Sequence, residues 1–263
     1  MPQSPLPESP SPAALPRAGL AYKPSLGCVL ERLRMLYSCR GFDQVFASFE
    51  VPSLALARFA EQHPAAFCEY PDPAERASFW NEYLKERTEL EDDSVPRAYL
   101  SEFDQGLYGG LLGGDVRFLV HQENGWISSM VPPLLEDWSG FDRLEQREDS
   151  IWLDRYCRQL CLFVEKARGK FGVSHFILID GLNFVFELVG ATQTYISLAE
   201  SPEMVRRAID LAFRVNLDVQ RRFFDTVPLL AGGGLYETGA GGSVSPCGAT
   251  GSRPLRMRSQ VAT

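Results

Sequence analysis

The sequence predicts an α/β fold with parallel strands, and three observations support this prediction. Apolar runs of strand length at 97–103, 174–179 and 227–230 alternate with longer segments of helical periodicity. The second run is apolar without alternation from 176 to 179, as in strands that are covered on both faces. Polar residues and glycines directly follow the first two runs. A strand, long helix, strand, long helix, strand order is typical of α/β proteins.

The two ends of the chain differ in composition from the middle. Residues 1–24 contain seven prolines interleaved with serine and alanine, which predicts a Pro-rich disordered leader. Residues 232–263 contain eight glycines and no helical or strand periodicity. They are expected to form a disordered tail, or a tail translated out of the reading frame as a result of a frameshift. The folded region is therefore expected at 25–231, which is 207 of the 263 residues.

Charge and cysteine content exclude several classes of protein. The net charge is −8, and because the two ends carry +1 and +2, the folded region carries −11. This acidity argues against nucleic acid or an anionic membrane as the partner. Six scattered cysteines without a Cys-x-x-Cys pair, and a start unlike a secretion signal, predict a cytoplasmic protein with reduced thiols. The most apolar stretch, 173–199, contains His175, Asp180 and Glu187 and is not expected to span a membrane.

The first half of the folded region is expected to be helical. Residues 29–37 and 52–62 each place apolar side chains on one face. Asp72-Pro73 starts a third helix, with an N-cap acid and proline at the first helical position, and this helix is expected to reach about Leu90. The acids at 91–93 are assigned to the following loop, because acids oppose the dipole at a helix C-terminus.

The second half is expected to hold a hairpin and two long helices. Residues 116–120 and 126–131 read as two strands around the turn Asn124-Gly125. Ser150 caps a long amphipathic helix that carries Cys157 and Cys161 on its apolar stripe, where a core position is a better interpretation than a metal site. Ser201-Pro202-Glu203 starts the last long helix, which runs to Phe224.

The stretch from Pro96 to Phe118 contains the strongest candidate site. A short apolar strand ends in Glu102, Asp104 and Gln105, and glycines follow at 106, 109, 110, 113 and 114. Glycine at this density permits positive φ angles and close approach of the backbone to a ligand. The residues alone leave a second interpretation open, in which this is a tight surface turn with a solvated aspartate.

A second polar strand end lies at Asp180 and Asn183. The carboxyl ends of parallel strands meet at one edge of a sheet, so these groups could converge with Asp104 on one pocket. Asp104 would then be the reactive acid, and Asp180 or Asn183 would position the substrate. Simple turn chemistry at Asp180-Gly181 is the alternative, and His121 is interpreted as a solvated or structural histidine.

These motifs together resemble the uroporphyrinogen decarboxylase superfamily. In that family an aspartate at a strand end is followed by Ala-Leu-Gly, an acid and valine. Here Asp104 is followed at the same spacing by Leu111-Leu112-Gly113-Gly114-Asp115-Val116. Pro133-Leu134 with Asp137-Trp138, Ile179-Asp180-Gly181 and the helix that begins at Ser201 resemble later family segments, so the likeness covers about residues 72–231.

The resemblance implies a (β/α)8 TIM-barrel fold, which in this chain would be incomplete and limited to the N-terminal part of the barrel. It implies decarboxylation of tetrapyrrole acetate side chains in porphyrin biosynthesis, without a cofactor, with a homodimer as the assembly. Asp104 would be catalytic, holding pyrrole N–H groups and stabilising the developing cation. The expected substrate-binding residues are Glu102, Gln105, Gly106, Tyr108, Asp180 and Asn183.

Two alternatives follow from departures from the family pattern. The Arg-Gln-Ala-Gly-Arg-Tyr loop that meets substrate carboxylates in the decarboxylase branch has no counterpart in this sequence. One alternative is a methyltransferase of the same superfamily, which would take a methylated corrinoid and use zinc. The zinc ligands of that branch belong to the half of the barrel that is missing here. The other alternative is a non-catalytic truncated fragment, because an open barrel leaves strand edges unpaired.

Overall fold

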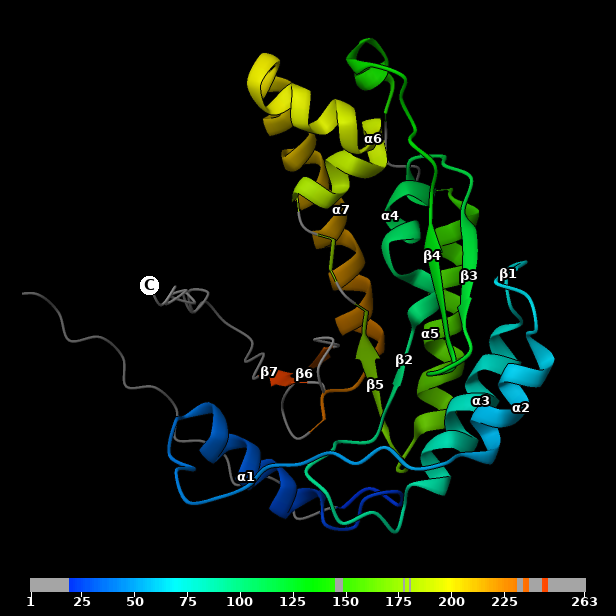
Figure 1. The fold of residues 1–263 in the computed structure, drawn as a ribbon, viewed down its shortest axis with the longest axis vertical. Helices are drawn as coiled ribbons and strands as arrows, with labels where there is room; N and C mark the ends of the chain where they lie inside the picture. The colour runs from blue at the N-terminus through cyan, green and yellow to red at the C-terminus, as the bar shows by residue number, and fades with distance from the viewer. Residues whose placement is uncertain are drawn as a thin grey trace, which may run out of the picture.

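A parallel sheet forms the centre of the structure, as the sequence predicts. The computed structural model describes residues 19–144, 149–176, 178–179, 181–230, 234–236 and 243–245. Strand β2 (Arg97–Tyr99) pairs in parallel with β5 (Gly172–His175), and β5 pairs in parallel with β6 (Gly234–Tyr236). Strand β7 (Ser243–Ser245) adds to β6 in the antiparallel direction, so the sheet order is β2-β5-β6-β7 (Figure 1).

The strand ends differ from the prediction. The strand expected at 97–103 stops at Tyr99, and Ser101–Phe103 forms a 3₁₀ turn, η1. The strand expected at 174–179 starts at Gly172 and ends at His175. No strand element forms at 227–230, and the third parallel strand is β6, inside the predicted glycine-rich tail. Val227 is buried in the core, whereas Leu229 is 46% exposed, so only the first residue of this apolar run is buried in the core.

The predicted hairpin is confirmed and belongs to a second, antiparallel sheet. Strands β3 (Arg117–His121) and β4 (Trp126–Met130) pair directly, and β1 (Phe67–Cys68) pairs with β3. Asn124 accepts a hydrogen bond from the Trp126 N–H at 3.0 Å, and Gly125 has a φ of +72° that favours glycine. The turn residues therefore set the register of the hairpin.

Helix starts follow the predicted caps. In α2 (Leu54–Gln62), α3 (Pro73–Glu86) and α5 (Ile151–Ala167), the side chain before the helix accepts a backbone N–H of the first turn. The Asp72 carboxylate accepts the N–H of Ala74 at 3.0 Å. Helix α3 ends at Glu86, before the predicted Leu90, and the acids after it lie in a loop as predicted.

The glycine stretch forms a helix, α4 (Gln105–Leu111), rather than a ligand-binding loop. A Cβ atom at Gly106 would lie 2.8 Å from the backbone nitrogen of Met130, and one at Gly109 would lie 2.2 Å from the Val131 side chain. These glycines therefore allow α4 to pack closely on β4. The expectation that glycines 106, 109 and 110 form a permissive loop is wrong, because they lie in a helix.

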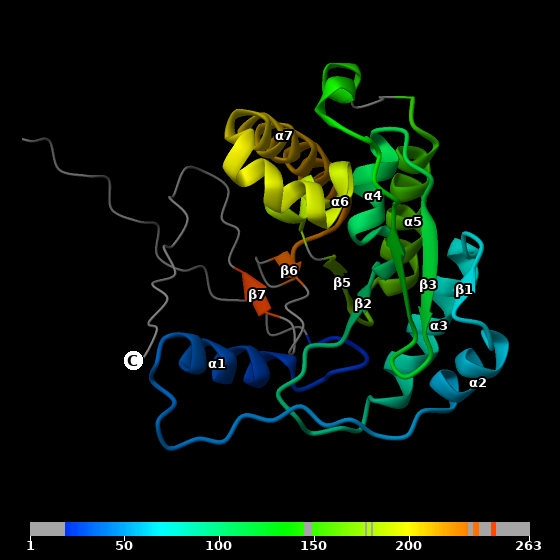
Figure 2. The ribbon, with the colours of Figure 1, turned by 45° about the horizontal axis from the view of Figure 1, so that its top comes forward.

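Two long helices cover the parallel sheet on the side of α4. Helices α6 (Gly181–Glu200) and α7 (Pro202–Thr226) lie side by side, at the upper left of Figure 1 and in contact in Figure 2. Helix α6 is kinked at Gly190, where φ is +77°. The buried residues of α3, α4, α5, α6, α7 and the sheet form one continuous hydrophobic core.

The N-terminal segment is part of the fold from residue 19 onward. The backbone N–H groups of Ala21 and Tyr22 donate to Gly169 and Lys170, and the buried Lys23 ammonium lies 2.8 Å from Asp92. Helix α1 (Leu26–Tyr37) then packs on the residues before β2. The disordered leader predicted for residues 1–24 therefore extends too far, because residues 19–24 belong to the fold and Lys23 is buried against the Asp92 carboxylate. Residues 1–18 lie outside the described residues.

The described part of the chain is a mixed α/β structure with two sheets, and its strands do not close into a barrel. A second 3₁₀ turn, η2 (Trp138–Arg143), follows the hairpin. Among the described residues, none of the helices is sufficiently long and apolar to cross a bilayer.

Candidate functional site

Asp104 is positioned by the 3₁₀ turn after β2 and immediately precedes α4. Its side chain makes no capping hydrogen bond to α4, and it faces the interior instead of the helix end. Burial raises the pKa of Asp104 to about 6, and the nearby backbone N–H of Gln105 only partly offsets this effect. A carboxyl group with this pKa exchanges protons near neutrality.

Glu187 brings a second carboxyl group to Asp104 from the neighbouring helix α6. The residue is 8% exposed, and neither carboxylate oxygen makes a hydrogen bond within the described residues. Burial raises the pKa of Glu187 to about 8, and the negative charge of Asp104 raises it further in the same direction. The backbone N–H of Gly109 lies near the Glu187 carboxyl group and partly lowers its pKa, although the two groups do not form a hydrogen bond in the described part of the chain. The two acids therefore share one electrostatic site.

Tyr108 completes the group between α4 and α6. It lies one helical turn after Asp104 and is fully buried, and its hydroxyl oxygen lacks a hydrogen-bond partner in the part of the chain that the structure describes. Burial raises the pKa of the Tyr108 phenol, and the charges of Asp104 and Glu187 raise it as well. The phenol therefore stays neutral and can only donate or accept a hydrogen bond.

The predicted substrate-binding residues divide into two groups. Gln105 and Asn183 lie half-buried on the first turns of α4 and α6, on the same side as Asp104, and Asn183 is one turn before Glu187. Gly106 packs against β4 and serves the fold rather than a ligand. Asp180 lies outside the described residues.

Glu102 is part of the buried core instead of the site. Its carboxylate forms an ion pair with Arg76 of α3 and accepts a hydrogen bond from the Gln159 side chain of α5 at 3.0 Å. Arg76 also donates to the Gly125 carbonyl at 2.8 Å. These partners lie on α3, α5 and the hairpin, whereas the carboxyl group on which the charge of Asp104 acts, that of Glu187, lies on α6. The predicted role of Glu102 in substrate binding is replaced by a structural one.

Glu187 is the functional candidate that the sequence analysis missed. The sequence shows it only as a single acid in the apolar run 184–189. A carboxylate in such a run, one helical turn after Asn183, is a signal, because charged residues are rarely fully buried without a partner. Only the packing of α6 on α4 reveals Asp104 as its neighbour.

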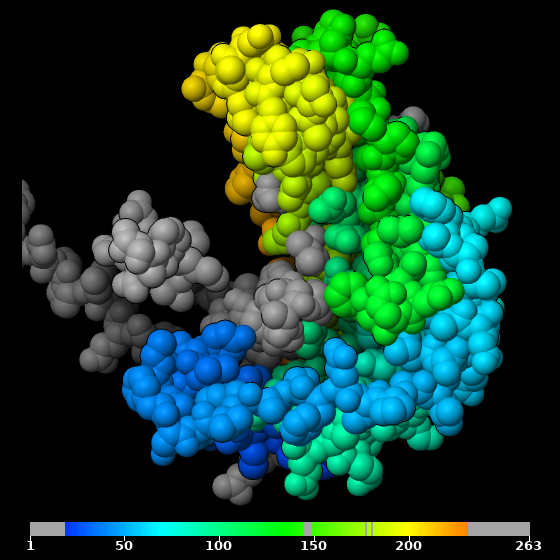
Figure 3. Space-filling view, viewed as in Figure 1, coloured from blue at the N-terminus to red at the C-terminus, as the bar shows by residue number. Residues whose placement is uncertain are grey.

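A segment after the hairpin fixes the position of α6. Because Gly190 breaks the helix, the carbonyls of Glu187 and Leu188 are available to accept the N–H groups of Leu134 and Leu135, at 3.2 and 2.8 Å. The indole N–H of Trp138 donates to Ser197 at 2.7 Å. Figure 3 shows this contact between α6, in yellow, and the green segment beside it. The Pro-Leu and Asp-Trp motifs therefore hold the helix that carries Glu187.

Glu187 makes the stability of the fold depend on pH near neutrality. Its pKa rises from 4.5 to about 8 on folding, so the folded chain binds more protons than the unfolded chain up to that pH. The free energy of unfolding should therefore decrease as pH rises toward 8. His175 opposes this trend at lower pH, because burial lowers its pKa from 6.5 to about 4.

Between pH 6.5 and 8 the contribution of Glu187 dominates, because the pKa values of His175, about 4, and Asp104, about 6, lie below this window. In Glu187→Gln, urea denaturation should give nearly equal free energies of unfolding at the two ends of this window. The unmodified chain should be less stable at the upper end. Equal pH slopes in both proteins would contradict the placement of Glu187.

The described residues do not fit a zinc site. No three His, Cys, Asp or Glu side chains within the described ranges gather in a geometry that would hold a metal ion. Cys161 is exposed, contrary to the expected core position, and Cys157 is half-buried beside it. The zinc and corrinoid chemistry of the methyltransferase alternative therefore has no donor set in this part of the chain.

Two hollows on the surface lie away from the acid pair. One, of about 680 Å³, lies between β1, β3 and the start of α5, and the other, of about 560 Å³, lies between α2 and α3. Neither is lined by Asp104 or Glu187. The acid pair remains the better candidate for chemistry, because burial raises the pKa values of both carboxyl groups toward neutrality. Burial also raises the pKa values of Cys68 and Tyr70 in the first hollow, but this keeps the thiol and the phenol neutral.

Comparisons with known proteins give one distant likeness. No protein-family model matches the chain, and no curated protein matches it. A solved methyltransferase from Methanosarcina mazei is similar at a TM-score of 0.47 and 12% sequence identity, over 75% of this chain. The chain spans 56% of the length of that protein. A likeness at this level carries no conclusion on fold or activity.

Proposed function

We propose that the chain is a decarboxylase of the uroporphyrinogen decarboxylase type, acting on acetate side chains of an electron-rich tetrapyrrole. The observation that carries this proposal is the buried pair of Asp104 and Glu187, whose pKa values are about 6 and about 8. Near pH 7, Glu187 is therefore mostly protonated and Asp104 mostly ionised. A proton donor beside a negative charge is the arrangement that acid-assisted decarboxylation needs.

In the proposed reaction, Glu187 is the proton donor and Asp104 stabilises the cation. Glu187 gives its proton to a ring carbon, and the pyrrole becomes a cation that the Asp104 carboxylate stabilises. The bond to the side-chain carboxylate then breaks, its electron pair neutralises the ring, and CO2 leaves. A second proton converts the remaining methylene to a methyl group, and loss of the ring proton reprotonates Glu187. Tyr108 stays neutral beside the two acids.

The order of the strands supports a barrel of the (β/α)8 type as the parent architecture. Strands β2, β5 and β6 follow one another as parallel neighbours, and each connection contains at least one long helix, α5 or the pair α6 and α7. Successive parallel neighbours joined by helices are the repeating unit of such barrels. Asp104 and α6 both follow strand ends at the carboxyl edge, where barrel enzymes place their chemistry.

The test is release of CO2 from uroporphyrinogen by the purified, folded chain. Asp104→Asn and Glu187→Gln should each reduce the rate of CO2 release at least tenfold. The first removes the carboxylate that stabilises the cation, and the second removes the proton donor. Asp115→Asn is the matched control, since Asp115 is an exposed acid beyond α4 and its loss should leave the rate unchanged.

Two outcomes would contradict the proposal. A cooperatively folded chain that releases no CO2 would favour the non-catalytic fragment. Release that is equally fast in both acid variants would place the chemistry elsewhere.

A further inference from the structure

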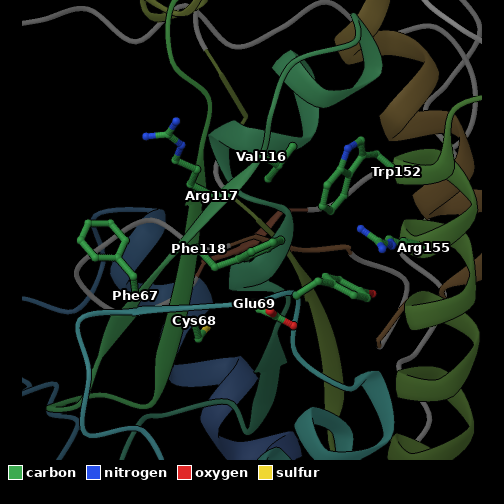
Figure 4. Close-up of a pocket in the computed structure, with 9 residues that line it drawn as sticks. Phe67, Cys68, Glu69, Val116, Arg117, Phe118, Trp152 and Arg155 are labelled. Atoms are coloured by element: carbon green, nitrogen blue, oxygen red, sulfur yellow. The ribbon is translucent and has the colours of Figure 1, made fainter.

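The larger surface hollow combines aromatic walls with a cation that has no acidic partner. Its volume of about 680 Å³ lies within the range of about 300–1,000 Å³ that is usual for small-molecule sites. It opens between β1, the start of β3 and the first turns of α5 (Figure 4). Its lining comprises Phe67, Cys68, Glu69, Tyr70, Val116, Arg117, Phe118, Trp152 and Arg155.

Three aromatic rings form the apolar floor of the hollow. The ring centroids of Tyr70, Phe118 and Trp152 are 5.7 to 5.9 Å apart in each pairing. The Tyr70 hydroxyl donates to Gln159 at 3.2 Å, and burial raises the pKa of this phenol, so it is neutral and fixed. The rings are tilted by 44 to 84° to one another, so they form an uneven apolar surface against which another aromatic ring can pack edge to face.

Arg155 places a positive charge beside the aromatic rings of the hollow. Its guanidinium lies 4.4 Å from the centroid of the Tyr70 ring and 4.5 Å from that of Trp152. Within the described residues it has no carboxylate partner. Stacking holds a guanidinium flat and leaves its N–H edge free to donate two parallel hydrogen bonds.

Figure 4 shows Trp152 and Arg155 reaching from α5 toward Phe118, whereas Phe67 and Arg117 line the opposite edge of the hollow. Arg117 is already beside Asp115, at 3.4 Å. Arg155 is therefore the cation that a ligand in the hollow would meet.

We infer that this hollow binds a small, flat aromatic carboxylate. The ring would pack edge to face against the half-buried rings of Tyr70 and Trp152, and the carboxylate would accept hydrogen bonds from two N–H groups of Arg155. The exposed Glu69 on the rim favours a ligand with one negative charge over a doubly charged phosphate. The site is separate from the acid pair, so it does not depend on the proposed decarboxylation.

The experiment is calorimetric titration of the full chain with 2-naphthoate at neutral pH. Arg155→Gln should weaken binding about tenfold or more, because a charge-assisted double hydrogen bond is lost. Arg168→Gln is the matched control, since Arg168 carries the same charge, is exposed after the C-terminal end of α5 and does not line the hollow. Its affinity for 2-naphthoate should equal that of the unmodified chain. Glu69→Gln should bind more tightly.

A neutral probe separates ring packing from charge recognition. The alcohol 2-naphthalenemethanol should bind weakly, and equally to the unmodified chain and to Arg155→Gln. Absence of 2-naphthoate binding up to concentrations on the order of 1 mM would overturn the inference. Equal weakening in Arg155→Gln and Arg168→Gln would overturn it as well, because the effect would then be one of net charge.

Discussion

Arg76→Ala is expected to lower the free energy of unfolding by about 3–5 kcal/mol, because it leaves the Glu102 carboxylate buried without its counter-ion. Both side chains are at most 2% exposed. Arg76 also stacks on Phe59 and Phe79, with its guanidinium carbon 5.1 and 4.9 Å from the ring centroids. Through these contacts it joins α2, α3, η1 and the hairpin turn. Urea denaturation followed by circular dichroism measures the loss.

Two comparisons separate the buried charge from other effects of the substitution. Arg58→Ala removes an ion pair with Glu82 in which both side chains are more than half exposed, and it should cost less than about 1 kcal/mol. Combining Arg76→Met with Glu102→Leu should recover most of the stability, because no buried charge then remains. A loss in Arg76→Ala that is as small as in Arg58→Ala would show that Glu102 is hydrated.

Gly106→Ala is expected to lower the free energy of unfolding by about 2–3 kcal/mol through overpacking of α4 on β4. The new methyl group would lie 2.8 Å from the Met130 backbone nitrogen, which cannot move without breaking the hairpin. Gly109→Ala should cost a similar amount, but its obstacle is the Val131 side chain at 2.2 Å. Thermal unfolding of the two variants measures both effects.

The two glycines should respond differently to a second substitution. Val131→Ala should restore part of the stability lost in Gly109→Ala, whereas Ser129→Ala should not rescue Gly106→Ala, because the backbone of Met130 remains in place. Gly27→Ala is the control, since no atom lies within 4 Å of its new methyl group and α1 should gain helix propensity. Rescue of both variants, or of neither, would contradict the packing described for α4.

Local signals predicted the helix starts and the hairpin, because the residues that cause them are adjacent in sequence. The Asp72 and Ser150 side chains bond N–H groups two residues ahead, and Asn124 and Gly125 form their own turn. The glycine-rich helix α4 was not predictable in this way. Glycine has poor helix propensity, and only the contact with β4 makes a glycine favourable there.

Of the two acids in the candidate site, only Asp104 could be predicted from the sequence. Asp104 stood out because it follows a strand and precedes glycines. Glu187 has no distinctive spacing, and its raised pKa arises from burial and from a neighbour 83 positions earlier in the chain. Glu102 looked equivalent to Asp104 in sequence, yet a 3₁₀ turn directs it toward Arg76. Such differences depend on side-chain direction after the strand, which the sequence pattern does not specify.

The parallel sheet also has a consequence for how the chain folds. Arg97 pairs with Gly172 and Ser174 pairs with Leu235, so these pairings close loops of 75 and 61 residues. His121 and Trp126, by contrast, pair across a turn of four residues. The entropy of closing the long loops must be met before the sheet contributes any stability. We therefore expect the hairpin and the helices to form early, and the pairing of β2, β5 and β6 to be completed last.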